Sequence, residues 1–356
     1  MLMSLLLGAA FLMPFSAAAQ NQKNMKYEET QVVKPQKLQL TQEWDKVFPK
    51  SDKVDHKKVT FVNRYGITLA ADQYTPKNAT GKVPALAVSG PFGAVKEQSS
   101  GLYAQQLAER GFLTIAFDPS FTGESGGQPR YMASPDINTE DFMAAVDYLS
   151  TNDQVDSNRI GIIGICGWGG ISLSAAAQDP RIKATVAVTL YDMSRVDAYG
   201  YFDQKTPDQR YQDRVNMTKQ RTEDYKRGYY KLGGGNPEQI TGGMPLFVKQ
   251  YREYYKTPRG YHKRSLNSNG GWNVIGQESY YNFRLFDYLP EIRNAVMIVH
   301  GDQAHSFYMG KTAYSLLTGN NKELVIVKGA NHTDLYDQMD KIPFDKIDAF
   351  FHQYLR

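Results

Sequence analysis

Cys166 is the single cysteine of the chain, and it lies within the run Ile160-Gly161-Ile162-Ile163-Gly164-Ile165-Cys166-Gly167-Trp168-Gly169-Gly170. An apolar strand that enters a glycine-rich turn and then a helix holds the side chain at the turn outward, above the sheet. The N-terminus of the following helix favours a thiolate, and the backbone N–H of Gly167 faces a developing oxyanion. We predict that Cys166 is a nucleophile for acyl transfer; the alternative is a small buried residue that follows a strand.

His332 is one of six histidines and stands directly after the last predicted strand, in the loop Lys328-Gly329-Ala330-Asn331-His332. A lone loop histidine is more often a solvent-exposed side chain than a catalytic one. Here the predicted nucleophile and the histidine both lie at the carboxyl ends of strands, where a base can reach a nucleophile across the top of a sheet. We predict that His332 carries the proton in catalysis.

A carboxylate is expected to hold the tautomer of the catalytic histidine. We predict Asp302 as this third catalytic group, because it is the only carboxylate in the loop His300-Gly301-Asp302-Gln303-Ala304-His305-Ser306. Asp192, at the end of the preceding strand, and Asp334 are alternative partners, and a dyad without an acid is a further alternative. His305 in the same loop either binds substrate or is a surface histidine.

The second oxyanion donor is expected in the loop Ser89-Gly90-Pro91-Phe92-Gly93, which joins a predicted strand to a helix. Pro91 has no N–H to donate, which leaves Phe92 or Gly93. We predict that the N–H of Phe92 acts together with that of Gly167; the alternative is a plain tight turn.

The segment Gly123-Glu124-Ser125-Gly126-Gly127 follows another predicted strand and is most simply a structural turn. Glu124 could instead approach Cys166 and modulate its thiol, and Asp192 and His305 are two further candidate modulators. No group of His, Cys, Asp or Glu has metal-ligand spacing, and no phosphate-binding loop is present. The sequence therefore predicts neither a metal nor a cofactor.

These residues require a scaffold in which strands and helices alternate. Apolar strands are predicted at 59–62, 67–74, 84–89, 112–117, 160–165, 184–190, 295–299 and 324–327. Amphipathic helices are predicted at 97–110, 137–150 and 169–177. This order predicts an α/β fold whose mostly parallel sheet is covered by helices on both faces, with ligands bound beyond the carboxyl ends of the strands.

The alternation stops between residues 192 and 290, where the sequence offers no convincing strand. We predict a helical cap at 192–290, inserted before the penultimate strand, so that residues 57–191 and 291–356 form the core. The segment 192–290 holds 16 Lys or Arg against 11 Asp or Glu, and 14 of the 24 tyrosines lie in 191–288. Such a cap favours a small acyl substrate that is aromatic or anionic; the alternative is a solvated subdomain that uses tyrosine for packing.

Residues 1–19 have the pattern of a signal peptide, because Leu2 to Phe15 is almost wholly apolar and Ala17 and Ala19 give the small-x-small cleavage pattern. We predict cleavage after about Ala19, an N-terminal arm over 20–56, and a periplasmic or secreted protein without stable membrane insertion; a retained N-terminal anchor is the alternative.

Hydrophobic residues make up 41% and charged residues 22%, which excludes a disordered chain. A formal charge of +4 over 356 residues gives no reason to expect a nucleic-acid partner.

The chain resembles the α/β-hydrolase superfamily, and within it the branch of dienelactone hydrolases and related hydrolases, over about residues 57–355 apart from the insertion. The resemblance rests on Asn63 to Ala70, Gly93 to Gln98, Asp118 to Gly127, Gly164-Ile165-Cys166 and His332 to Asp337. It implies an α/β-hydrolase fold with a Cys-His-acid site and acyl-transfer chemistry, usually hydrolysis of esters or lactones. The chain departs from the superfamily pattern at Trp168, where a small residue is usual, and at Ala304 and His305, where the acid commonly lies.

Three functions compete on this evidence. The first is an exported hydrolase that cleaves an ester, thioester or lactone through a Cys-His-acid acyl-enzyme mechanism; with an acceptor other than water it would be an acyltransferase, and the same scaffold hosts peptidases. The second is a nucleotide-binding oxidoreductase, which the missing G-x-G-x-x-G spacing argues against. The third is a non-catalytic binding protein on a hydrolase scaffold. We predict the first.

Overall fold

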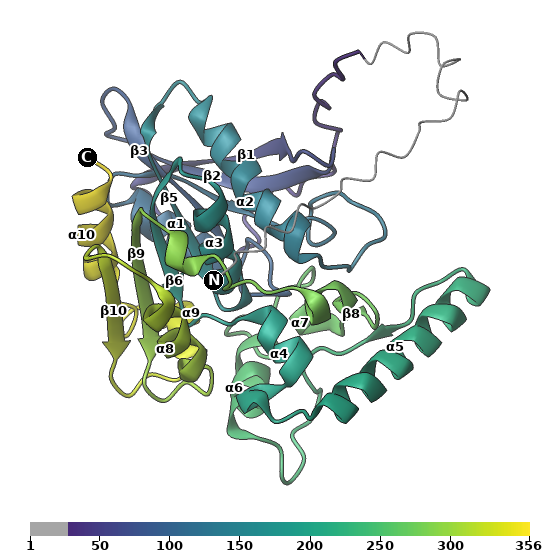
Figure 1. The fold of residues 1–356 in the computed structure, drawn as a ribbon. Coiled ribbons are helices and arrows are strands. Elements are labelled where there is room, and N and C mark those ends of the chain that lie inside the picture. Colours follow the sequence, from purple (N-terminus) through teal and green to yellow (C-terminus); the bar gives the residue numbers. More distant parts are fainter. Residues whose placement is uncertain (1–27) are drawn as a thin grey trace, which may run out of the picture. The chain divides into compact units, whose positions relative to one another are not determined.

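The computed structural model describes residues 28–356, so the predicted signal peptide 1–19 lies outside the described residues. The chain divides into two units. In the first, Met1–Val32, the described residues 28–32 form neither helix nor strand. The second, Val33–Arg356, contains every helix and strand of the described residues (Figure 1).

An eight-stranded sheet runs through the second unit in the order β1-β2-β4-β3-β5-β6-β9-β10 (Figure 1). β2 pairs antiparallel with both β1 and β4, whereas the other neighbours are parallel. The structure therefore confirms the predicted α/β fold with a mostly parallel sheet. The strands are β1 (Val54–Val62), β2 (Thr68–Pro76), β3 (Val83–Ser89), β4 (Leu113–Phe117), β5 (Val155–Ile165), β6 (Ile182–Val188), β9 (Ala295–Gly301) and β10 (Lys322–Val327).

Helices cover both faces of this sheet, as two glycines of β5 show. Side chains alternate between the two faces along a strand. A Cβ on Gly161 would lie 2.8 Å from Phe351 of α10, whereas a Cβ on Gly164 would lie 2.6 Å from the hydroxyl of Ser172 of α3. The two helices therefore pack against opposite faces of β5. The helices around the sheet are α1 (Ser99–Ala108), α2 (Pro135–Ser150), α3 (Gly167–Gln178), α8 (Phe307–Leu316), α9 (Asp334–Asp337) and α10 (Phe344–Tyr354) (Figure 1).

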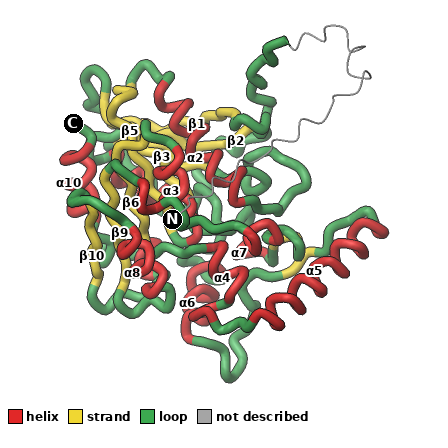
Figure 2. Tube along the Cα trace, in the orientation of Figure 1, coloured by secondary structure: helices red, strands yellow, loops and turns green. Residues whose placement is uncertain are grey.

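The insertion between β6 and β9 is mostly helical, as predicted, and precedes the penultimate strand of the large sheet (Figure 2). Its helices are α4 (Met193–Tyr199), α5 (Pro207–Arg227), α6 (Leu246–Tyr255) and α7 (Leu266–Asn269). The expectation that it holds no strand was wrong, because β7 (Leu232–Gly233) pairs antiparallel with β8 (Trp272–Asn273). Strands of two residues are too short to produce a recognisable alternation of apolar and polar residues.

The segment predicted as an arm, 20–56, is partly built into the core. β1 begins at Val54, which is 3% exposed and pairs with Pro76 of β2. Further upstream, Lys46 Nζ lies 2.9 Å from Asp72 Oδ2, and both side chains are fully buried. This part of the segment is therefore an integral part of the fold.

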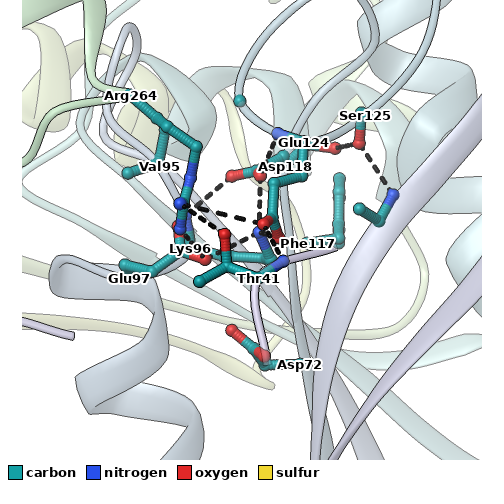
Figure 3. A network of polar contacts seen from close by, with 12 residues as sticks. Thr41, Asp72, Val95, Lys96, Glu97, Phe117, Asp118, Glu124, Ser125 and Arg264 are labelled. Atoms are coloured by element: carbon teal, nitrogen blue, oxygen red, sulfur yellow. Dashed lines mark hydrogen bonds and ion pairs between the residues drawn. The ribbon is translucent and has the colours of Figure 1, made fainter. Parts of the chain in front are cut away.

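A buried network of charged side chains fixes the loop that carries Phe92 (Figure 3). Lys96 follows this loop, and its Nζ lies 2.8 Å from Glu97, 2.7 Å from Asp118 and 2.7 Å from Glu124. Arg264, from the insertion, lies 2.8 Å from Glu97 as well. Because buried carboxylates need cationic partners, these contacts hold the loop against both β4 and the insertion.

Candidate active site

Cys166 occupies the sharp turn between β5 and α3. Its backbone adopts φ +59° and ψ −126°, a conformation that residues other than glycine rarely adopt. The following glycine allows the turn to close, because a Cβ on Gly167 would lie 2.7 Å from the Phe92 Cβ and 2.9 Å from the Met193 Sδ. The local sequence therefore produces the outward-pointing turn that was predicted for this segment.

Trp168, which departs from the superfamily pattern, points into the core and away from the turn. Its side chain is 1% exposed and packs edge-on against Phe117 and Phe142, with ring centroids 5.6 Å and 5.3 Å away. The bulk of this residue is thus absorbed between α2, α3 and β4.

Four polar groups near the thiol of Cys166 lower its pKa. They are the hydroxyl of Tyr336, the backbone N–H groups of Gly167 and Phe92, and the hydroxyl of Tyr251. Burial nevertheless raises the pKa of the Cys166 thiol above its ordinary value, and the hydrogen bonds offset this effect only in part. The N–H of Gly167 at the N-terminus of α3 does favour the thiolate, but burial outweighs it in the substrate-free site.

Alkylation of Cys166 by iodoacetamide should consequently be slow at neutral pH and should accelerate as the pH rises above about 9, the ordinary range of a thiol pKa. The thiol is protonated below its raised pKa, and only the thiolate attacks the reagent. Rates measured by mass spectrometry between pH 6 and pH 10 check this. Fast alkylation that is already constant at pH 6 would contradict the raised pKa.

His332 is fully buried and hydrogen-bonded through both ring nitrogens. Its Nε2 lies 3.0 Å from the hydroxyl of Tyr336, while its Nδ1 lies 2.7 Å from Ser306 Oγ and 2.9 Å from Thr189 Oγ1. Burial, and then the neighbouring His305 and His300, hold the pKa of His332 well below its ordinary value. The imidazole is therefore neutral at physiological pH.

Tyr336 lies beside both the nucleophile and the base: its hydroxyl is 3.0 Å from Nε2 of His332, and it lowers the pKa of the Cys166 thiol. Burial raises the pKa of Tyr336 well above its ordinary value, which keeps the phenol protonated and able to donate. The structure thus places the hydroxyl of Tyr336 near both the predicted nucleophile and the predicted base.

The prediction that Asp302 orients His332 is contradicted. Oδ1 of Asp302 accepts hydrogen bonds from the N–H of Gly329, at 2.7 Å, and from the side chain of Gln303. The side chain lies at the surface of the turn after β9 and closes that turn against the loop that follows β10. No carboxylate is among the hydrogen-bond partners of His332.

The two alternative acids are also engaged elsewhere. Asp192 caps the N-terminus of α4, where its side chain accepts from the backbone N–H of Arg195 at 3.0 Å. Asp334 accepts from Lys341 at 2.6 Å and from the backbone N–H of Asn331. Neither is a hydrogen-bond partner of His332. The hydroxyls of Ser306 and Thr189 instead bond to Nδ1, where an acid was expected.

The proposed modulators separate into two groups. Glu124 lies in the buried network, where Lys58 and Lys96 lower the pKa of its carboxyl to about 2, and it does not bond to Cys166. Its expected role as a thiol modulator is therefore wrong, and Asp192 has only the capping role. His305 does lie at the site, with its ring centroid 5.2 Å from that of His332 and its Nε2 against the hydroxyl of Tyr191.

A cavity of about 510 Å³ opens onto the thiol. The insertion supplies most of its wall, which is rich in aromatic side chains. Its lining residues include Phe92, Cys166, Tyr191, Tyr201, Tyr251, Tyr255, Trp272 and Tyr336. A concave, aromatic cavity beyond the carboxyl ends of parallel strands is suited to a small organic substrate.

Sequence reasoning missed three residues of this site: Tyr336, Ser306 and Thr189. Tyr336 lies four residues after His332, within the short helix α9 that follows it. Thr189 carries none in sequence, but its backbone adopts φ +43°, which is unusual for a β-branched residue and turns its hydroxyl toward His332.

Within residues 28–356, no group of three or more His, Cys, Asp or Glu side chains is arranged to hold a metal ion. In the same part of the chain, no helix combines the length and apolar character needed to span a bilayer.

The sequence of this chain was compared with protein families and with known proteins. Residues 65–334 match the X-Pro dipeptidyl-peptidase (S15) family. The uncharacterized protein PA2218 of Pseudomonas aeruginosa is 55% identical over 320 residues, which cover 89% of this chain and 86% of that protein. The uncharacterized protein YcjY of Escherichia coli is 36% identical over 292 residues, 79% of this chain and 92% of that protein.

Two solved structures have the same fold as this chain. The crystal structure of PA2218 superposes with a TM-score of 0.87 at 54% identity and covers 90% of this chain and 99% of that one. The α/β hydrolase GrgF from Penicillium superposes with a TM-score of 0.71 at 19% identity, over 85% of this chain and 99% of that one. The fold is thus that of the α/β-hydrolase superfamily.

Proposed function

The chain belongs to the X-Pro dipeptidyl-peptidase (S15) family of α/β hydrolases. On this scaffold we propose that it hydrolyses carboxylic esters, thioesters or lactones through Cys166. The observation that carries the proposal is the set of groups around one thiol. A strained turn presents Cys166 to an aromatic cavity, and two backbone amides and the Tyr336–His332 pair converge on its sulfur.

In the proposed first step, Sγ of Cys166 attacks the substrate carbonyl carbon while its proton moves to Tyr336 and the phenolic proton of Tyr336 moves to Nε2 of His332. The carbonyl oxygen becomes an oxyanion that accepts hydrogen bonds from the N–H groups of Phe92 and Gly167. The C–O or C–S bond to the leaving group then breaks, and the proton returns through Tyr336 to the departing oxygen or sulfur. Water attacks the resulting thioester by the same route and releases the acid and the free thiol.

The surroundings of His332 favour esters and thioesters over amides. An amine leaves a tetrahedral intermediate only after it receives a proton, whereas an aryl oxide or thiolate leaves with less assistance. No carboxylate stabilises an imidazolium at His332, and burial and two neighbouring histidines hold its pKa low. In this respect the proposed activity is closer to that of dienelactone-hydrolase-like ester hydrolases than to the peptidases that give the family its name.

The proposal is tested by comparing three chromogenic substrates: p-nitrophenyl butyrate, a butyryl thioester and alanyl-prolyl p-nitroanilide. We expect turnover of the ester and the thioester, with kcat/KM well above that for the anilide. Turnover of the anilide alone would contradict an ester-hydrolase function and would favour a peptidase. Turnover of none of the three, together with an inert thiol, would favour the non-catalytic binding protein.

Tyr336→Phe should lower kcat for the ester by about 10²-fold, in the range typical of a lost proton-transfer group, while KM changes little. The phenyl ring preserves the packing of Tyr336 but removes the hydroxyl that lies beside both Cys166 and His332. Tyr148→Phe, which removes a hydroxyl that bonds to Gln73 outside the cavity, is the matched control and should keep most of the activity. Equal kcat values for Tyr336→Phe and the wild type would remove Tyr336 from the mechanism.

We also propose that the protein acts outside the cytoplasm, in the periplasm or as a secreted protein. This proposal rests on the apolar segment and small-x-small pattern of residues 1–19. Cell fractionation and N-terminal sequencing test it, and a mature chain that begins near Gln20 is expected. A cytoplasmic protein that retains Met1 would contradict it.

A further inference from the structure

The loop that carries Phe92 is held in place by the insertion, through contacts that the proposed chemistry does not use. The side-chain amide of Asn267 donates to the carbonyl oxygen of Phe92, with the two atoms 2.7 Å apart. The hydroxyl of Ser265 and the backbone N–H of Asn267 donate to the carbonyl oxygen of Gly93, at 3.0 Å and 3.2 Å. Ser265 and Asn267 stand at the start of α7, so one short segment holds two consecutive carbonyl groups of the loop.

Close packing reinforces these hydrogen bonds. Gly93 has φ +83°, and a Cβ on it would lie 2.6 Å from Oδ1 of Asn267, so a glycine at this position lets the amide approach the loop. The ring of Phe92 stacks on that of Trp272 in β8, with centroids 4.6 Å apart and an interplanar angle of 22°. The insertion therefore fixes both the backbone and the side chain of Phe92.

The two carbonyl oxygens have no other hydrogen-bond donor in residues 28–356. The N–H of Phe92, the predicted oxyanion donor, belongs to the same residue as one of these carbonyls, so a rotation of the loop that breaks the bond from Asn267 also displaces this N–H. An oxyanion is stabilised by donors that are already aimed at the place where charge develops. A misplacement of about 1 Å in an active site can cost about 10²-fold in rate.

We propose that Ser265 and Asn267 are positioning residues of the oxyanion site, which set the N–H of Phe92 at the place where the carbonyl oxygen of the substrate becomes negative. The insertion then contributes to catalysis as well as to the cavity wall. The proposal rests on the proposed hydrolase function, because it assigns the Phe92 N–H to an oxyanion. Its structural half, that the two residues hold the loop, does not depend on turnover and is tested separately.

Ser265→Ala and Asn267→Leu each remove a side-chain donor to the loop. We expect each to lower kcat for p-nitrophenyl butyrate by about tenfold while KM changes little, which is less than the roughly 10²- to 10³-fold cost of removing an oxyanion donor outright. Ser265 does not line the cavity at Cys166, so its effect does not come from a lost substrate contact. Ser268→Ala is the matched control, because this hydroxyl of α7 bonds to the N–H of His262 and not to the loop. Wild-type kcat in both Ser265→Ala and Asn267→Leu would overturn the proposal.

A transition-state analogue separates positioning from a general change of the cavity. 1,1,1-Trifluoroheptan-2-one accepts the sulfur of Cys166 at its carbonyl carbon, so that its oxygen becomes an oxyanion and the thiol proton moves to His332, whereas heptan-2-one has a similar shape but stays a ketone. We expect both variants to weaken inhibition by the trifluoro ketone by the same factor as kcat/KM, and to leave inhibition by heptan-2-one unchanged. Equal weakening of the two ketones would show a distorted cavity and would overturn the positioning role.

Hydrogen exchange separates this inference from the proposed function. It is measured by mass spectrometry on the peptide that covers residues 90–98, in the wild type and the three variants. We expect faster exchange in Ser265→Ala and Asn267→Leu than in the wild type, and no change in Ser268→Ala. Faster exchange in those two variants, with no ester hydrolysis by the wild type, would overturn the hydrolase function and keep the support of the loop. Ester hydrolysis by the wild type, with exchange and kcat unchanged in both variants, would overturn the positioning role and keep the hydrolase.

Discussion

Cys166→Ala should lower kcat for p-nitrophenyl butyrate by at least about 10³-fold, because removing a covalent nucleophile eliminates the acyl-enzyme route altogether. His332→Ala should cause a loss of similar size, since the two residues act as one unit and their effects are not additive. The double variant should therefore be no worse than either single variant. Steady-state release of p-nitrophenol from all three proteins measures this.

A control for Cys166→Ala is Ser174→Ala, which makes a comparable change at a buried position of α3 outside the cavity. It should keep wild-type kcat. Turnover that survives in Cys166→Ala would remove the nucleophile, and losses that multiply in the double variant would show that Cys166 and His332 act independently.

Lys96→Met should destabilise the protein by about 3–5 kcal/mol, the cost of removing one partner from a buried ion pair. Methionine has a similar length but leaves the carboxylates of Glu97, Asp118 and Glu124 without the ammonium that lies 2.7–2.8 Å from each. Urea denaturation measures the free energy of unfolding. Lys53→Met, whose ammonium is 71% exposed and lies 3.7 Å from Glu109, is the matched control and should change it by less than about 0.5 kcal/mol.

The pH dependence of stability gives a second test of the same network. The neighbouring lysines lower the pKa of Glu124 from 4.5 to about 2, so its contribution to stability is complete above pH 4.5 and is lost as the pH falls toward 2. In Lys96→Met this pKa should rise and the acid-induced loss should be smaller. Equal stability of Lys96→Met and the wild type would show that the network adds nothing net to folding.

The scaffold was predictable because its signals are local. The central strands β3, β4, β6 and β9 are short, mostly apolar runs, and a glycine-rich turn such as that after Ile165 has few alternatives to a strand–turn–helix. The position of Cys166 follows from these features alone. The ends of the strands were less certain: β5, for example, begins at Val155 rather than at Ile160, because its first residues are polar and partly exposed.

The partners of the catalytic histidine were not predictable in the same way. Asp302 has the right residue type in the right loop, but its carboxylate turns toward Gly329. The hydroxyls that replace it come from Ser306 and Thr189, which are 117 residues apart in the chain. Serine and threonine occur throughout the sequence, so only the packing of β6 beside β9 shows which hydroxyls reach the imidazole.

The charge of the cavity was likewise not predictable from the sequence. The insertion is basic in composition, yet Lys205 is the only basic residue on the cavity wall, which also carries Asp197. A composition sums over all faces of a segment, whereas a ligand contacts one of them. Several tyrosines of the insertion do line the cavity, whereas most of its Lys and Arg residues do not, and an aromatic or anionic substrate stays a prediction.

The most direct test of the account is to trap the acyl-enzyme. The protein is mixed with p-nitrophenyl butyrate, quenched in acid during turnover and digested for mass spectrometry. We predict a butyryl group on the peptide that contains Cys166, removed by neutral hydroxylamine as a thioester is, and absent from Cys166→Ala. Turnover with no acyl group on Cys166, or with the acyl group on another residue, would contradict the account.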